Sequence, residues 1–186
     1  MKSLHRRKFI QQTSLLTLGT LATSAVFASK TNEEIKKIKI GLIGVGFRGQ
    51  VHLSELLKRE DVTVTAIADP DEKMVAMAEK IVFKSGKQNP VVYINGNQDY
   101  KNLLKRDDVD AVVISTPWEW HAEQTIASVN ASKIVGVEVC GAIKLADCWD
   151  MVNASEKAGI PVMILENVCY RRDVMAVFNM VKKGMF

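Results

Sequence analysis

The sequence predicts an α/β protein built on a doubly wound parallel sheet. Short apolar segments alternate along the chain with longer segments of helical character, from Ile38 onward. Because the short segments are apolar nearly throughout, they indicate strands that are covered on both faces of a sheet. The regular alternation of strand and helix implies right-handed crossover connections, which make neighbouring strands parallel.

The individual elements follow from the residue pattern. The apolar segments predict strands at 38–45, 62–68, 109–115, 133–139 and 160–165, and a further short apolar segment, 91–94, lies within the turn-rich stretch 84–97. The first helix is expected to turn Leu53, Leu56 and Leu57 toward one side. The predicted helices are 47–58, 71–83, 99–105, 118–130, 146–158 and 172–183.

The N-terminal residues predict a signal peptide, 1–28, followed by a linker, 29–37. Arg6 and Arg7 precede a stretch with no charged residue between Lys8 and Lys30, and Ala28 ends it. The paired arginines favour export by the twin-arginine route, which carries folded proteins, and hence a periplasmic or exported location. An ordinary secretory signal with a chance pair of arginines is the alternative. A stable membrane anchor is not favoured, because the apolar core is short and rich in hydroxyl groups.

Composition limits the class of protein that follows the leader. Four of the 25 basic residues and none of the 21 acidic ones lie within 1–28, so the remaining chain is formally neutral. A neutral chain excludes the broad basic face of a nucleic-acid-binding protein. About 158 residues suffice for one domain with one core. Cys140, Cys148 and Cys169 have no metal-binding spacing, and their odd number excludes a disulfide framework, so we expect buried thiols.

A glycine-rich turn follows the first predicted strand. The residues Gly44-Val45-Gly46-Phe47-Arg48-Gly49 form the pattern G-x-G-x-x-G between a strand and a helix. Gly44 allows a tight turn, Gly46 lets the backbone approach a pyrophosphate, and Gly49 lets helix and strand pack closely. The helix N-terminus offers free N–H groups to phosphates, and Arg48 can add a charge-assisted contact. The alternative is a glycine-rich turn that binds nothing.

A carboxylate, Asp69, ends the second predicted strand 25 residues after Gly44. In a Rossmann domain this is the place for an acid that accepts hydrogen bonds from the adenosine ribose hydroxyls. An acid here would repel a 2′-phosphate, so NAD is favoured over NADP. The alternative is a helix N-cap within Asp69-Pro70-Asp71, and both interpretations hold together if Asp71 is the cap.

The stretch after the strand 109–115 combines aromatic, acidic and imidazole side chains. Trp118, Glu119, Trp120 and His121 lie where open α/β sheets bind their ligands, at the carboxyl ends of the strands. Tryptophan rings stack on ribose, nicotinamide or sugar. The alternative for each is local: packing, the helix dipole or a cap. His52, inside the first helix, is expected to be structural.

These motifs resemble the Gfo/Idh/MocA superfamily, which includes glucose–fructose oxidoreductase and inositol dehydrogenase. The resemblance rests on the G-x-G-x-x-G turn, Asp69, a T-P-x-x-x-H turn that ends at His121, and a glutamate at the end of the strand 133–139. Where the superfamily has Glu-Lys-Pro, this sequence has Glu138-Val139-Cys140. That lysine commonly serves catalysis in the dehydrogenase members, so its absence argues against simple sugar dehydrogenation.

Several further short motifs resemble glycoside hydrolase family 109, which contains NAD-dependent α-N-acetylgalactosaminidases. They are WEWH (118–121), EV before Gly141-Ala142, DCW (147–149), LENVCYRR (165–172) and NMVKKGMF (179–186). Tyr170 and Arg171 lie near the expected site edge, and no catalytic residue is assigned. The resemblance implies NAD contacts at Phe47, Arg48, Asp69, Trp118, Glu119, Trp120, His121, Glu138, Val139 and Asn167, in addition to the three glycines.

The resemblance also implies an activity and a second domain. Members of the family cleave N-acetylgalactosaminides by transient oxidation at C3, elimination and re-reduction, and they export a retained NAD. A second, α+β domain follows the Rossmann domain in the family, and the chain ends before it, at Phe186. We therefore expect no turnover by this chain alone. The alternatives are an exported sugar oxidoreductase and an inactive truncated domain; the resemblance also leaves room for a homo-oligomer.

Overall fold

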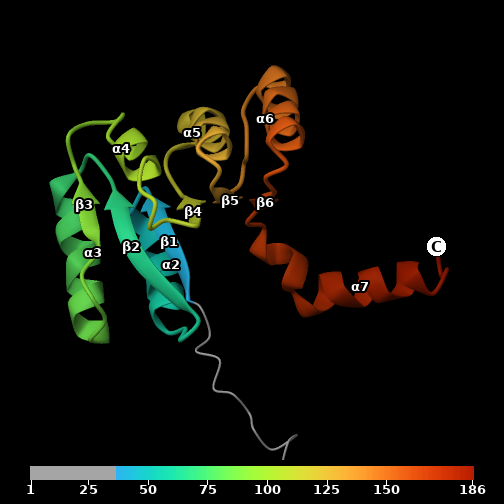
Figure 1. Cartoon of the computed structure of the whole chain (residues 1–186). Coiled ribbons are helices and arrows are strands. Elements are labelled where there is room, and N and C mark those ends of the chain that lie inside the picture. The colour runs from blue at the N-terminus through green and yellow to red at the C-terminus, as the bar shows by residue number, and fades with distance from the viewer. Residues whose placement is uncertain (1–36) are drawn as a thin grey trace, which may run out of the picture. The chain divides into compact units, whose positions relative to one another are not determined.

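A six-stranded parallel sheet runs through residues 37–186, the part of the chain that the computed structural model describes (Figure 1). The predicted signal peptide, and the linker up to residue 36, lie outside the described residues. The strand order is β3-β2-β1-β4-β5-β6, and every neighbouring pair is parallel. The strands are β1 (Ile38–Ile43), β2 (Val62–Ala68), β3 (Val91–Tyr93), β4 (Ala111–Ile114), β5 (Ile134–Val137) and β6 (Val162–Ile164).

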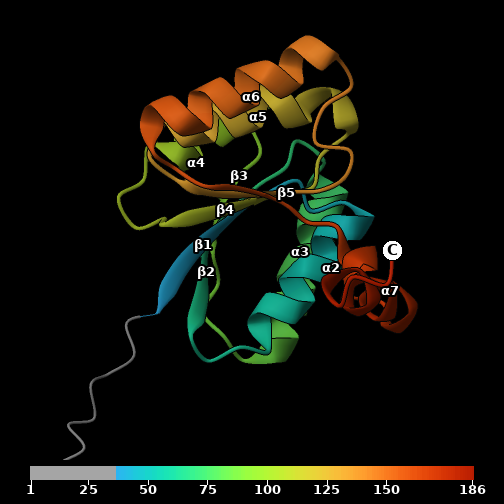
Figure 2. The same cartoon turned by 90° about the vertical axis from the view of Figure 1, so that its right-hand side faces the viewer.

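Helices cover both faces of the sheet, which confirms the doubly wound architecture (Figure 2). On one face lie α2 (Phe47–Leu57) and α3 (Glu72–Ser85), and on the other lie α4 (Tyr100–Leu104), α5 (Trp118–Asn130) and α6 (Leu145–Ala158). A short 3₁₀ helix, η1 (Asn167–Tyr170), and α7 (Arg172–Lys182) follow β6, and α7 extends away from the sheet (Figure 1). The sequence pattern predicted neither this 3₁₀ helix nor β3, which forms from the short apolar segment within the turn-rich stretch 84–97.

Alternation along β1 explains why the sheet has two cores. Leu42 packs with Leu53 of α2 in the core on one face, and Ile43 packs with Ala122 of α5 in the core on the other. Both strand side chains are at most 1% exposed. Successive side chains of a strand point to opposite faces, so a continuously apolar strand needs cover on both sides.

Local capping determines where α3 begins and ends. The side chain of Asp71 accepts hydrogen bonds from the backbone N–H groups of Lys73, at 2.8 Å, and Met74, at 3.4 Å, so Asp71 is the N-cap. The prediction that Asp71 rather than Asp69 does the capping is therefore confirmed. Gly86 ends the helix with a left-handed φ of +68°.

The prediction that the three cysteines are buried thiols is wrong. Cys140, Cys148 and Cys169 are all exposed and unbridged. They lie in the loop after β5, on α6 and in η1, which are segments toward the β6 end of the sheet, where fewer side chains are buried. Among the described helices, none combines the length and the apolarity that a membrane crossing needs.

Candidate dinucleotide-binding site

The glycine turn is folded tightly against the tips of β1, β2 and β4. Gly44 has a φ of +88°, and a Cβ there would lie 2.8 Å from the backbone nitrogen of Thr116. A Cβ on Gly49 would lie 2.2 Å from the carbonyl oxygen of Gly44, closer than any real contact. The hydroxyl of Ser115 donates to that same carbonyl at 2.9 Å. Only glycine at both positions lets α2 start this close to the sheet.

The N-terminus of α2 is open to a ligand. Gly46 is its N-cap, no side chain caps the helix, and its first turn contains no acidic residue. A Cβ placed on Gly46 would meet nothing within 4 Å, so the backbone faces open space there. The first N–H groups of a helix lack intrahelical acceptors, and together with the helix dipole they attract phosphate. Phe47, the next residue, is 93% exposed.

Asp69 lies at the tip of β2, beside the glycine turn. Its Oδ2 accepts the backbone N–H of Val45 at 2.7 Å, and its Oδ1 accepts that of Asp71 at 2.9 Å. These two bonds hold the carboxylate in place from two neighbouring turns. Each carboxylate oxygen has a second lone pair, so both can still accept a hydrogen bond from a ribose hydroxyl.

The glycine turn and Asp69 border a cleft of about 290 Å³. Of the predicted site residues, Gly44, Gly46, Asp69 and Trp120 line this cleft. Sequence reasoning did not assign the other lining residues to a site: Pro70, Asp71, Met74, Asn97, Ser115, Thr116, Pro117 and Gln124. Asn97 could have been found, because it follows β3 at the same edge of the sheet. A glycine cradle, an uncapped helix and an anchored carboxylate in one cleft fit a dinucleotide.

Glu138 joins the end of β5 to α2. Its Oε1 accepts a hydrogen bond from Arg48 Nε at 2.6 Å and lies 2.6 Å from His52 Nε2. Glu138 is only 7% exposed. Burial raises the pKa of Glu138, but the hydrogen bonds from Arg48 and His52 outweigh burial and hold that pKa below its ordinary value. The carboxylate is thus charged at neutral pH and clamped by two donors.

His121 is fully buried beneath the turn that follows β4. Its Nδ1 lies 2.7 Å from the carbonyl oxygen of Cys140, and its Nε2 lies 2.8 Å from that of Thr116. A neutral imidazole has one N–H and satisfies one of these carbonyls, whereas an imidazolium satisfies both. The ring therefore ties the β4 turn to the loop after β5, and its predicted direct contact with a cofactor stays a prediction.

Four other predicted residues lie outside the cleft lining. Trp118 and Glu119 open α5 and are exposed, Trp118 by 60%. Val139 is 38% exposed in the loop after β5, and Asn167 is exposed at the start of η1. All four follow the carboxyl ends of strands, so they border the same edge of the sheet, and their contact with NAD stays a prediction.

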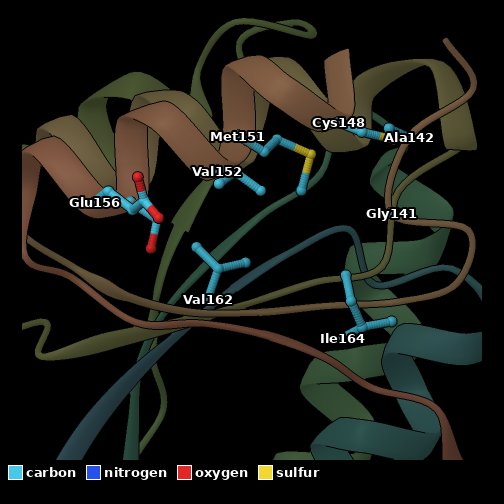
Figure 3. Close-up of a pocket in the computed structure, with 9 residues that line it drawn as sticks. Gly141, Ala142, Cys148, Met151, Val152, Glu156, Val162 and Ile164 are labelled. Atoms are coloured by element: carbon cyan, nitrogen blue, oxygen red, sulfur yellow. The ribbon is translucent and has the colours of Figure 1, made fainter. Parts of the chain in front are cut away.

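A second pocket, of about 540 Å³, lies between α6 and β6 (Figure 3). Figure 3 shows Met151 and Val152 of α6 above Val162 and Ile164 of the strand, with the Glu156 carboxylate at one end. This pocket shares no lining residue with the cleft at the glycine turn. It has none of the phosphate-binding features of that cleft.

The fold and the cleft define a dinucleotide-binding domain of the Rossmann type. Residues 38–165 match a family described as "Oxidoreductase family, NAD-binding Rossmann fold". The chain therefore belongs to this family, Gfo/Idh/MocA, as its motifs predicted, and its cofactor is NAD.

Curated relatives match the whole chain, and two of them illustrate the likeness. A glycosyl hydrolase family 109 protein of Stenotrophomonas maltophilia is 39% identical over 100% of this chain and 40% of its own length. The alpha-N-acetylgalactosaminidase of Shewanella oneidensis is 32% identical over 100% of this chain and 44% of its own length. The chain thus spans about two fifths of the length of the curated relatives it matches.

Solved structures agree on the fold. The scyllo-inositol dehydrogenase of Lactobacillus casei, with bound NAD(H) and scyllo-inositol, superposes with a TM-score of 0.69 at 20% identity, over 81% of this chain and 42% of that one. The WlbA dehydrogenase of Chromobacterium violaceum, in complex with NADH and UDP-GlcNAcA, gives 0.70 at 21% identity, over 80% of this chain and 40% of that one. At these identities the likeness shows the fold alone.

Proposed function

We propose that this chain is the NAD-binding domain of an exported glycosidase that cleaves N-acetylgalactosaminides. The observation that carries the proposal is the cleft in which the glycine turn, the open N-terminus of α2 and Asp69 converge. The proposed sugar substrate is inferred from a relative: the Shewanella oneidensis protein, which matches the whole chain, is named alpha-N-acetylgalactosaminidase. The absence of the dehydrogenase lysine after Glu138 supports a hydrolase over a simple dehydrogenase.

Each part of the cleft has a distinct task. The glycine turn gives the pyrophosphate access to the backbone, and the first N–H groups of α2 hydrogen-bond its oxygens. Asp69 accepts hydrogen bonds from the adenosine ribose and repels a 2′-phosphate. When bound, NAD would supply a reversible hydride acceptor for C3 of the sugar, which is the chemistry of oxidation, elimination and re-reduction.

The leader motivates the proposal of export. Such a cycle is redox-neutral, so one retained NAD serves many turnovers where no free NAD is supplied. Arg6 and Arg7 favour the twin-arginine route, which transports folded proteins with their cofactors. Residues 1–36 fused to a reporter that is active only after folded export should give activity in the periplasm. Loss of that activity on replacing both arginines with lysine is expected. A fusion that reaches the periplasm without reporter activity, whether or not the arginines are replaced, would point to an ordinary secretory signal.

A first experiment tests the NAD site through Asp69. Calorimetry with the full chain should show NAD binding, and Asp69→Ala should weaken it by roughly tenfold to a hundredfold, the effect of one lost charge-assisted hydrogen bond. Asp69→Asn keeps the shape and serves as a second variant, because Asp69→Ala also frees two backbone N–H groups. Asp150→Ala, on the exposed surface of α6, is the matched control. Unchanged affinity in both Asp69 variants would leave Asp69 with a structural role only.

A second experiment tests the substrate class with a chimera. Residues 37–186 would replace the matching segment of the Stenotrophomonas maltophilia relative, and release of N-acetylgalactosamine from an aryl α-N-acetylgalactosaminide would be measured. We expect turnover by the chimera and none by this chain alone. A folded chimera that binds NAD but yields a net oxidised sugar would favour the exported oxidoreductase instead. A chimera without either activity would favour the inactive domain.

A further inference from the structure

We propose that His52 is a positioning residue of the NAD site, acting through Glu138 on Arg48. The proposal rests on the NAD site described above and adds a residue outside the cleft. His52 lies on the second turn of α2 and lines neither of the two pockets described above. Its side chain is 20% exposed, and that of Glu138 is 10% exposed.

Helix geometry brings two donors to one acceptor atom. Arg48 and His52 are four residues apart on α2, so their side chains leave the same face of the helix. Both reach the same oxygen, Oε1 of Glu138, at 2.6 Å each. One carboxylate oxygen therefore serves both residues, and the orientation of the carboxylate depends on both.

The contact leaves the outer end of Arg48 available for a phosphate. Only Nε of Arg48 bonds to Glu138, and among the described residues no hydrogen bond joins its two terminal nitrogens to a protein group. The Arg48 side chain is 41% exposed and belongs to the first turn of α2, next to the open N-terminus. Its terminal nitrogens are therefore the groups that can meet the pyrophosphate.

His52 keeps Glu138 from binding the Arg48 guanidinium through both carboxylate oxygens. Arginine and carboxylate prefer a bidentate pair in which Nε and one terminal nitrogen bind both oxygens. With the His52 N–H held on Oε1, the carboxylate is fixed in the one-point contact that the structure shows. Without His52, Glu138 is free to turn and bind Arg48 through both oxygens, which removes a terminal nitrogen from the ligand.

The test compares two substitutions that differ in hydrogen bonding at one position. His52→Leu fills the volume but has no donor, and His52→Gln places an amide N–H near the position of Nε2. We expect His52→Leu to weaken NAD binding by about tenfold and His52→Gln to stay within about threefold of the unsubstituted chain. Thermal unfolding of each variant is measured in parallel. If His52→Leu does not fold, His52→Asn replaces it, because its amide is too short to reach Glu138.

Two further measurements separate positioning from a loss of packing. Adenosine has no pyrophosphate, so its affinity should be the same in all His52 variants. In an Arg48→Ala background, His52→Leu should have no additional effect on NAD binding, since the residue through which it acts is gone. Glu55→Gln, on the exposed side of α2, is the control that should leave both affinities unchanged.

The outcomes distinguish this proposal from the NAD site itself. Equal weakening by His52→Leu and His52→Gln, no weakening by His52→Leu, or equal loss of adenosine and NAD affinity overturns the role of His52 alone. An unsubstituted chain that binds no NAD overturns the proposed function, and this proposal with it. Selective loss of NAD affinity in His52→Leu, rescued by glutamine, supports the positioning role.

Discussion

The inner strands of the sheet and its β6 edge differ in how far their side chains are buried. On the inner strands β1 and β2, Leu42 and Ile67 are 0% exposed, and α2 buries Leu53 completely. At the β6 edge, Met163 is 54% exposed, and α7 has no buried residue although it carries many apolar side chains. Both regions contain many apolar residues, but they differ in how far the structure buries them.

This difference in burial indicates which part of the candidate site is fixed in place by packing and hydrogen bonds among the described residues. The glycine turn and Asp69 are fixed by buried strands, by close backbone contacts and by hydrogen bonds to two turns. Asn167 and Tyr170 lie on η1, where no residue is buried. Segments with few buried contacts open at low free-energy cost. The glycine turn and Asp69 therefore form a preformed part of the site, whereas η1 is only weakly constrained.

The largest expected effect comes from removing a buried apolar side chain near the inner strands, compared with removing an exposed one on α7. Leu53→Ala should lower the free energy of unfolding by about 2–5 kcal/mol, because it deletes a fully buried side chain and leaves a cavity. Phe178→Ala, on α7, should cost less than about 1 kcal/mol, because Phe178 is 48% exposed. Urea unfolding of both variants gives the two numbers. A large loss from Phe178→Ala would show that α7 packs in solution and would break the comparison.

The next largest effect is expected at Gly49, and it should differ from the effect of the same substitution at Gly46. Gly49→Ala should lower stability by about 1–3 kcal/mol and abolish NAD binding, because its Cβ would lie 2.2 Å from the backbone oxygen of Gly44. Gly46→Ala should leave the melting temperature nearly unchanged, since nothing lies within 4 Å of its Cβ.

Binding measurements complete this pair. The new methyl group of Gly46→Ala faces the open side where the pyrophosphate approaches, so NAD affinity should fall by at least tenfold while the fold remains intact. Calorimetry and thermal unfolding of the same samples test both statements. Undiminished NAD affinity in Gly46→Ala would mean that the pyrophosphate does not approach the backbone at this position.

Most of the fold could be predicted because the spacing of apolar residues and the helix-capping residues are local features of the sequence. The strand Val62–Ala68 and the helix Trp118–Asn130 have the boundaries that the sequence predicts, and Asp71 caps α3 as expected. The 3₁₀ helix was missed, because a four-residue turn has no hydrophobic period to recognise. The three cysteines were placed wrongly because burial depends on which segment packs on which, and residue type alone does not determine this.

The candidate site was predictable where one motif contains its geometry. Gly44, Gly49 and Asp69 follow from a strand–turn–helix pattern of fixed spacing. The contacts of Glu138 with Arg48 and His52 join residues about 90 positions apart and could not be read from either segment. His121 illustrates the same limit. Its place in a motif suggested a ligand contact, and the structure shows both ring nitrogens at backbone carbonyls.

The smallest effect is a pH dependence at Glu138, compared with an exposed pair near the C-terminus. The hydrogen bonds from Arg48 and His52 outweigh burial, so the pKa of Glu138 is lower in the folded than in the unfolded chain. A lowered pKa contributes stability above the unfolded value of about 4.3, and that stability is lost as the pH falls through the folded value. Glu138→Gln should therefore cost about 1 kcal/mol at pH 7 and progressively less below pH 4.

The exposed ion pair between Arg171 and Asp173 provides the control for this titration. Its side chains are 64% and 62% exposed, and pairs of that exposure contribute little to stability. Asp173→Asn should therefore change the free energy of unfolding by a few tenths of a kcal/mol at most. An effect of Glu138→Gln at pH 7 as small as that of Asp173→Asn would mean that Glu138 is solvated like Asp173. The β5 tip would then be as loosely held as the segment after β6, and the preformed part of the site would be limited to the glycine turn and Asp69.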